Sequence, residues 1–152
     1  MSTDQVQAKA QCTCGAVSIA ISAAPRFRVL CHCSICRAFN NDTHADILVY
    51  SAPNVEPHEP GTIAFKRWRP PPNVRRGVCV SCGQPALERF KAPPFMNLTM
   101  IPTPMVAAPV PEPAAHIFYD KRVADVDDAL PKHEGYWASQ WAFMKLVMST
   151  RK

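Results

Sequence analysis

The sequence lacks long apolar runs, and it lacks a segment that would direct the chain to a membrane or out of the cell. No stretch approaches the roughly 20 apolar residues that a membrane-spanning helix needs. The N-terminal residues MSTDQVQAKAQ contain neither a basic start nor an apolar stretch, so they do not resemble a secretory signal. Charged residues make up 19% of the chain and apolar residues 47%, a balance that excludes a disordered protein. We therefore expect a cytoplasmic protein without a membrane partner, in which cysteines stay reduced.

Uninterrupted helical sequence is also scarce, because 16 prolines break up the chain. Proline removes a backbone donor and clashes with the preceding turn, which excludes a long helix from residues 50–115. The segments between the prolines are rich in β-branched and aromatic residues, which predicts short strands. These segments are 16–22, 45–50, 62–68 and 116–120. We find no internal repeat, and 152 residues suit one domain, so we expect a mainly β domain that spans residues 1–152.

A single segment, residues 133–148, reads as a helix of some length. It contains no proline, and four large apolar side chains recur at helical spacing. These are Trp137, Trp141, Met144 and Met148. The stripe could bind a partner or lie on a membrane, or it could pack on its own domain. Terminal amphipathic helices usually dock on their own core, so we expect these four side chains to be buried there.

Seven cysteines are the most distinctive feature of the composition. An odd number cannot pair fully as disulfides, and metal ligation is the leading alternative in a reducing compartment. The cysteines form three groups: CTC at 12–14, CHCSIC at 31–36 and CVSC at 79–82. Seven thiolates and two divalent ions together carry three negative charges, which would reduce the formal net charge from +5 to +2. The basic composition is therefore weak evidence for nucleic-acid binding, and we do not expect that partner.

The spacing within the groups predicts two kinds of metal site. In a strand, cysteines two residues apart present both thiols on one side, so His32 would point away from its neighbouring thiols. A C-x-x-C followed by glycine is typical of a zinc knuckle, in which Gly83 takes a positive φ and backbone N–H groups face the sulfurs. One closed tetrahedron is completed by the four-cysteine group, which comprises Cys12, Cys14, Cys79 and Cys82. The three-cysteine group comprises Cys31, Cys33 and Cys36. Three ligands with an open position are the layout of a catalytic zinc site, whereas a closed tetrahedron is structural.

Other arrangements of the cysteines remain open at this point. Cys31 or Cys33 could join the structural site, but that arrangement leaves other thiols without partners. The three-cysteine group could also be buried thiols without a metal, although three within six residues make this the weakest alternative. An iron–sulfur cluster normally takes four cysteines. Thiolate-rich tetrahedral sites select zinc or iron, so we expect two zinc ions per chain.

The order and spacing of four motifs resemble one family closely. CTCGAVSIAI, CHCSICRAF, CVSCGQPAL and HIFYDKR, from about Gln11 to Asp127, are similar to the glutathione-dependent formaldehyde-activating enzymes and centromere protein V. The resemblance implies a β-tent fold of small antiparallel sheets held by zinc. It also implies a structural zinc on the four-cysteine group and a second zinc on the three-cysteine group. The activity it implies is a carbon–sulfur lyase reaction, the condensation of formaldehyde with glutathione to S-(hydroxymethyl)glutathione.

Zinc held by three thiolates is suited to exchanging a fourth, incoming thiolate. A substrate thiol such as glutathione could bind there, or the zinc could orient the carbonyl of a small aldehyde. We therefore expect the three-cysteine group to be the catalytic site. His32, His44 and His116 are possible acids or bases by type alone, and a structural role is the default for each. The alternative function is a zinc-stabilised binding module without catalysis.

A basic stretch, FKRWRPPPNVRRG at 65–77, surrounds Trp68 with five cations. These are Lys66, Arg67, Arg69, Arg75 and Arg76. A solvated hairpin with basic edges is the first interpretation, since edge charges prevent unwanted strand pairing. Binding of an acidic small molecule such as glutathione comes second, and nucleic acid third.

Overall fold

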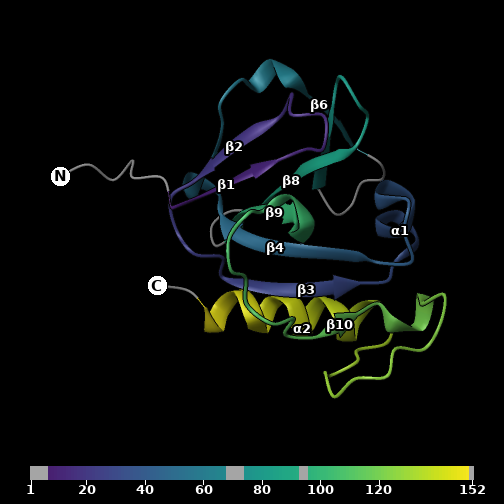
Figure 1. Ribbon diagram of the computed structural model, residues 1–152. Coiled ribbons are helices and arrows are strands. Elements are labelled where there is room, and N and C mark those ends of the chain that lie inside the picture. Colours follow the sequence, from purple (N-terminus) through teal and green to yellow (C-terminus); the bar gives the residue numbers. More distant parts are fainter. Residues whose placement is uncertain (1–6, 68–73, 93–95, 151–152) are drawn as a thin grey trace.

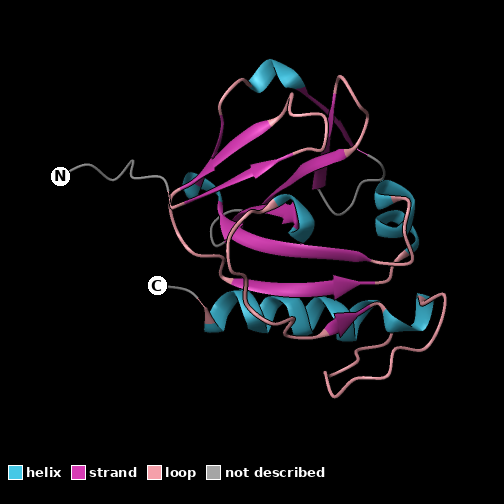
Figure 2. Cartoon of the chain, in the orientation of Figure 1, coloured by secondary structure: helices cyan, strands magenta, loops and turns pink. Residues whose placement is uncertain are grey.

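The structure is a computed structural model that describes residues 7–67, 74–92 and 96–150. Within these residues the chain is mainly β, with two α-helices and two sheets, as the sequence predicts (Figures 1 and 2). The smaller sheet has the order β1 (Ala8–Gln11), β2 (Ser18–Ile21), β5 (Val55–Pro57). The larger sheet has the order β10 (His116–Ile117), β3 (Phe27–Cys31), β4 (Ala45–Ser51), β9 (Met96–Pro102), β8 (Pro85–Ala92), β7 (Val74–Cys79), β6 (Ile63–Arg67). The helices are α1 (Ser34–Asn40) and α2 (Tyr136–Ser149).

The larger sheet is buried on both faces, with the smaller sheet on one side and α2 on the other (Figure 1). Strand β4 shows how the sequence produces this arrangement, because side chains alternate along a strand. Ile47 and Val49 enter the core beneath α2, which we call the helix-side core. Leu48 and Tyr50 enter the core beneath the smaller sheet, which we call the sheet-side core. A strand buried on both faces needs a nearly continuous apolar run, and ADILVYS supplies one.

Neighbouring strands of the larger sheet are antiparallel, except that β10 pairs in parallel with β3. The pairing of β7 with β8 shifts between Gly77 and Val78, which is a β-bulge. A Cβ atom at position 77 would lie 2.6 Å from Cγ2 of Ile63, so only glycine fits there without displacing β6. The bulge re-aims the end of β7 just before its cysteine, a usual role for such an irregularity.

The predicted strands are confirmed in place but not always in length. The segments at 16–22, 45–50 and 62–68 correspond to β2, β4 and β6, although residue 68 lies outside the described residues. Val17, Ile19 and Ile21 are buried, as the alternation of this segment predicts. The strand expected at 116–120 is wrong beyond residue 117, because Phe118 adopts a left-handed conformation that turns the chain into a 3₁₀ helix. The larger sheet also has more strands than a fold of small sheets implies.

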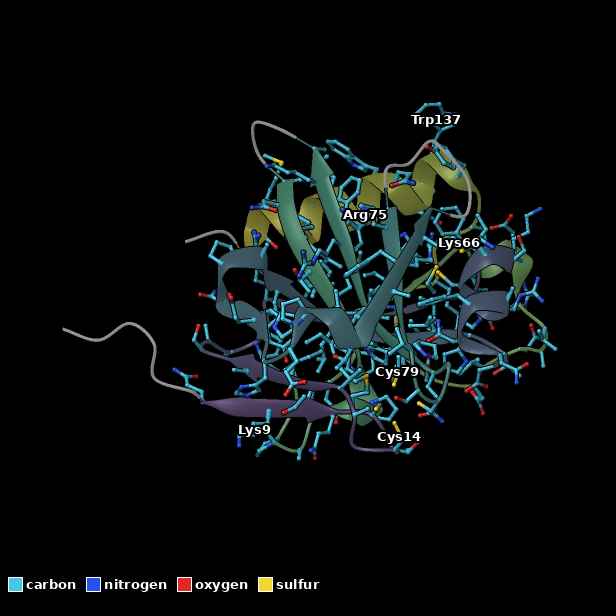
Figure 3. The ribbon with its side chains drawn as sticks, turned by 90° about the horizontal axis from the view of Figure 1, so that it is seen from above. Lys9, Cys14, Lys66, Arg75, Cys79 and Trp137 are labelled. Atoms are coloured by element: carbon cyan, nitrogen blue, oxygen red, sulfur yellow. The ribbon has the colours of Figure 1, made fainter. Side chains whose placement is uncertain are left out.

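Helix α2 confirms the expected C-terminal helix packed on its own domain, but of the four side chains predicted to be buried only Met144 packs against the core. Trp137 and Trp141 are 81% and 61% exposed, and Trp137 projects from the molecule in Figure 3. The helix instead buries Ser139, Ala142 and Val147. These residues also follow helical spacing, and their small side chains allow the helix to approach the sheet more closely than tryptophan would. No helix in the described part of the chain is both long and apolar enough to cross a membrane.

Candidate metal centres

The four-cysteine group joins turns that belong to the two different sheets. Cys12 and Cys14 lie in the turn between β1 and β2, whereas Cys79 ends β7 and Cys82 lies in the turn before β8. All four sulfurs lie within 4.8 Å of one another. Figure 3 shows Cys14 and Cys79 close together. The expectation that CTC lies in a strand is wrong, because β1 ends at Gln11; the turn itself brings the two sulfurs together.

Backbone N–H groups point at the sulfurs on both sides of this group. The contacts are Val17 N to Cys12 Sγ at 3.4 Å, Ala16 N to Cys14 Sγ at 3.4 Å and Cys82 N to Cys79 Sγ at 3.5 Å. Gly83 has a φ of 76°, as the knuckle motif predicts. Donors aimed at sulfur stabilise the thiolate form, which is the form that binds metal.

The thiols of this group also contact one another, and they therefore ionise unequally. Cys12 Sγ lies 3.2 Å from Cys14 Sγ. Burial opposes ionisation of Cys12, but the N–H of Val17 and the neighbouring thiols lower its pKa to about 6. The N–H of Ala16 favours the Cys14 thiolate, yet the shared contact with Cys12 raises the pKa of Cys14 to about 12. Four crowded thiols cannot all ionise together unless a cation lies among them.

The three-cysteine group lies where β3 passes into α1. Cys31 is the last residue of β3, and Cys33 is the N-cap of α1, whose sulfur accepts from the N–H of Cys36 at 3.3 Å. The three sulfurs lie within 4.8 Å of one another. The prediction that both Cys31 and Cys33 lie in a strand is wrong, because the helix begins directly after Cys33. The helical turn is what returns Cys36 to the other two.

The residues of the three-cysteine group differ in exposure. Cys31 and Cys36 are only 4% and 6% exposed, whereas Cys33 is half-buried. Hydrogen bonds from the Cys31 and Cys36 thiols hold the pKa of Cys33 far below its ordinary value. The pKa values of Cys31 and Cys36 are raised in return, chiefly through contacts with the other thiols. Of the three thiols, Cys33 therefore ionises most easily, and it belongs to the most exposed residue of the group.

A buried ion pair adjoins this group, and the sequence analysis missed it. Nε of Arg76 lies 3.0 Å from a carboxylate oxygen of Glu88, and both residues are buried. The guanidinium lies 5.9 Å from the ring of Phe39 on α1. Its positive charge contributes to the lowered pKa of Cys33, and burial raises the pKa of Glu88. Strand alternation places Arg75 and Arg76 on opposite faces of the sheet. The prediction of a single basic edge over residues 65–77 did not take this alternation into account. Trp68 and Arg69 lie outside the described residues.

A chain of hydrogen-bonded side chains fixes His32, which lies between two cysteines of the group. Nε2 of His32 lies 2.8 Å from Nδ1 of His116, and Nε2 of His116 lies 2.8 Å from Oδ2 of Asp128. The carboxylate can only accept, so His116 donates to Asp128 and accepts from His32. Burial, followed by the nearby His116 and His44, lowers the pKa of His32 to about 4.

The surroundings complete this arrangement. Lys132 donates to Asp128 at 2.6 Å, and hydrogen bonds from Lys132 and His116 hold the pKa of Asp128 well below its usual range. The ring of Tyr119 packs edge-on against both His32 and His116. His44 lies against the ring of His32, with the centroids 5.2 Å apart. The three histidines named by type are therefore brought together, whereas nothing in the sequence pattern pointed to Asp128 as their partner.

The donor sets fit metal ions at both places. Thiolates are soft ligands, and sulfurs within 4.8 Å of one another can converge on a common ion. Among the described histidines, cysteines, aspartates and glutamates, no fourth ligand atom joins the three-cysteine group. The two clusters could thus hold one closed ion and one ion with a free coordination position.

Comparison with known proteins relates the chain to one family and one solved structure. The family described as glutathione-dependent formaldehyde-activating enzyme matches residues 7–121. A crystal structure of a Rhodobacter sphaeroides protein, solved as a structural genomics target, has a TM-score of 0.53 and 17% sequence identity. That match covers 68% of this chain and 91% of the other, and it shows a shared fold. No curated protein matches the chain.

Proposed function

The chain belongs to the family of glutathione-dependent formaldehyde-activating enzymes, and on that basis we propose that it adds a thiol of the glutathione type to a small aldehyde such as formaldehyde. The observation that carries the proposal is the convergence of three sulfurs without a fourth described ligand. The four-cysteine group would hold a structural zinc, and the three-cysteine group would hold the second zinc at the reaction site. We further propose one zinc-binding domain, acting in the cytoplasm, where its thiols stay reduced.

The reaction forms one carbon–sulfur bond. The sulfur of the substrate thiolate attacks the carbonyl carbon, the C=O electron pair moves to oxygen, and the oxygen takes a proton to give a hemithioacetal. Zinc bound by Cys31, Cys33 and Cys36 would supply a site at which an incoming thiol is held as its thiolate.

The residues beside Cys33 serve binding and orientation in this proposal. Arg76 places positive charge next to a group that becomes anionic when its thiols ionise. Lys66 pairs with Arg76 in the β6–β7 ladder, lies on the same face and is exposed. An exposed ammonium there is suited to a carboxylate of an acidic thiol such as glutathione. The buried His32 and His116 hold the CHC segment in place rather than transfer protons, since their hydrogen bonds run to Asp128.

The alternative of a binding module without catalysis is supported by the low exposure of Cys31 and Cys36. A zinc held mainly by buried cysteines could be a second structural ion. The two functions differ in whether an added thiol binds through its sulfur, and one experiment distinguishes them.

The test combines metal analysis with calorimetry. Protein purified without added metal should contain about two equivalents of zinc and little iron, as the two donor sets predict. Glutathione should bind, and S-methylglutathione should bind at least about tenfold more weakly, because the methyl group blocks coordination by sulfur. Cys33→Ser should lose the preference, whereas Lys145→Gln on the exposed side of α2 should keep it. Equal binding of the two ligands, or none, would refute thiolate coordination and favour the binding module.

A further inference from the structure

An open cavity lies on the opposite face of the larger sheet from the three-cysteine group. Its volume is about 730 Å³, within the usual range for small-molecule sites. One wall is formed by β5 and the turns beside it, including Val55, Glu56 and Pro57. The other wall is formed by β7, β8 and β9.

Strand register places this cavity apart from the proposed reaction site. Arg76 pairs with Glu88, and Glu88 pairs with Met100, which belongs to the same core as Cys31 and Cys36. The next residues along these strands point the other way. Arg75 pairs with Arg89, Arg89 pairs with Thr99, and Thr99 pairs with Tyr50 of the sheet-side core.

Arg75 also lies well away from Cys14 and Cys79, so the four-cysteine group is not part of this cavity (Figure 3).

Two arginines face each other across this wall. Arg75 and Arg89 are direct partners on antiparallel strands, a position in which like charges destabilise a sheet. Both guanidinium groups lie over the ring of Phe65, with their central carbons 5.2 Å and 5.0 Å from its centroid. The ring therefore contacts both cations, and both arginines line the cavity.

The rest of the lining adds charge and hydrogen-bonding groups. Lys91 lies two residues beyond Arg89 on the same face and pairs with Asn97. The acidic lining residue is Glu56, so cations exceed anions three to one. Within the described residues, Arg75, Arg89 and Lys91 form no ion pair. Three cations at one wall, with a single acidic lining residue and no ion pair to any of them among the described residues, form a site suited to an anion.

We infer that this cavity binds a small organic anion carrying at least two negative charges, a phosphate ester or a dicarboxylate. Paired guanidinium groups match the oxygen geometry of both chemistries, and Lys91 adds a third point of attachment. Asn97 and Thr99 offer hydrogen bonds beside the cations, and Val55 and Pro57 offer an apolar wall for the carbon part of the ligand. The ligand also relieves the repulsion between Arg75 and Arg89 that the free protein has to tolerate.

The test measures binding of pyrophosphate and of citrate by calorimetry at a constant ionic strength of about 0.15 M, which suppresses unspecific charge effects. The double variant Arg75→Gln with Arg89→Gln removes both guanidinium groups. The matched control, Lys9→Gln with Lys145→Gln, removes two exposed charges on other elements. Lys91→Gln is the second test variant, because no ring contact to Lys91 occurs among the described residues and its loss leaves the cluster over Phe65 intact.

At least one of the two anions should bind saturably to the wild-type protein, and the tighter one identifies the ligand chemistry as phosphate or carboxylate. The double variant should lose at least about tenfold in affinity, Lys91→Gln about threefold or more, and the control less than about twofold. Glutathione binding should be unchanged in all of them, which keeps this result separate from the proposed function. If the double variant does not fold, Lys91→Gln decides. Absence of saturable binding, equal binding by the arginine variants, or an equal loss in the control would overturn the inference.

Discussion

At the scale of single residues, the buried pair of Arg76 and Glu88 links the sheet to the three-cysteine group. Each charge would be costly alone in the core, and each compensates the other. The raised pKa of Glu88 shows that burial outweighs the stabilising effect of Arg76 on its carboxylate. The pair therefore contributes a positioned positive charge beside Cys33 more than it contributes stability.

Removing Arg76 should show how strongly this residue stabilises the buried carboxylate of Glu88. Arg76→Ala leaves Glu88 buried without a partner, and we expect a loss of about 3 kcal/mol in the free energy of unfolding at pH 7.5. A carboxyl whose folded pKa is raised stabilises the fold below its unfolded pKa, and that stability is lost as the pH rises through the folded value. Without Arg76 the folded pKa of Glu88 rises further, so the loss relative to wild type should shrink as the pH is lowered towards 5.5.

Urea unfolding of both proteins at the two pH values measures this difference. Asp125→Ala, which breaks the ion pair between Arg122 and the exposed Asp125, serves as the control and should cost less than about 1 kcal/mol. An Arg76→Ala penalty that does not change with pH would mean that lost packing, rather than an unpaired carboxylate, is responsible.

At the scale of elements, the two cysteine groups differ in what they connect. The four-cysteine group connects the β1–β2 turn to the β7–β8 turn, and Cys14 and Cys79 are 65 residues apart. The three-cysteine group connects only the end of β3 to the first turn of α1. A metal that closes a long loop restrains the unfolded chain more than one that closes a short loop.

Serine substitutions should therefore have unequal consequences. We expect Cys82→Ser to cost several kcal/mol and to yield insoluble or partly unfolded protein, as loss of a structural metal does. Cys33→Ser should remain folded, because serine is itself a good N-cap for α1, and should lose one metal equivalent and thiol binding. Neither cysteine is buried, so lost packing contributes little to either result.

Circular dichroism, melting temperature and zinc content of the two variants decide the matter. If Cys33→Ser unfolds as severely as Cys82→Ser, then the three-cysteine group is a second structural site, and the proposed catalytic role fails.

The two sides of α2 provide another contrast between elements. Val147 packs in the helix-side core, so Val147→Ala should cost about 2 kcal/mol. Trp141 is larger but exposed, and Trp141→Ala should change the free energy of unfolding by no more than about 0.5 kcal/mol. Chemical unfolding of the two variants measures both values. A larger cost for Trp141→Ala would show that its ring has a partner in solution.

At the scale of the whole molecule, metal content should control net charge. With every thiol protonated the formal net charge is +5, and with seven thiolates and two divalent ions it is +2. Metal withdrawal at pH 7 should therefore make the protein more cationic, because the released thiols whose pKa values are raised, such as Cys31 and Cys36, take up protons. Native electrophoresis alongside zinc analysis measures the shift, and readdition of zinc should reverse it. A mobility that does not change on metal loss would show that the sulfurs were not bound as thiolates.

The sequence by itself determined those features that depend on neighbouring residues. Alternation along ADILVYS set which core each side chain of β4 enters, since a strand has a fixed period of two. The C-x-x-C-G motif set the turn around Gly83, because its geometry is local. Spacing also divided the cysteines into three groups, although only the tertiary structure joins CTC to CVSC, and the family resemblance is confirmed over residues 7–121.

Tertiary structure decided which side chains are buried and which ones pair, where these contacts join elements that are distant in the sequence. Both the large apolar side chains of α2 and its small ones recur at helical spacing. Only the packing of α2 against the sheet decides that Ala142 and Val147 are buried and that the tryptophans are exposed. The pairing of Arg76 with Glu88, and of Arg75 with Arg89, follows from the register of β7 with β8. The contact of His32 with His116 requires β10 to lie beside β3, 84 residues apart along the chain. Register is fixed by the packing of both cores at once, and no local pattern contains that information.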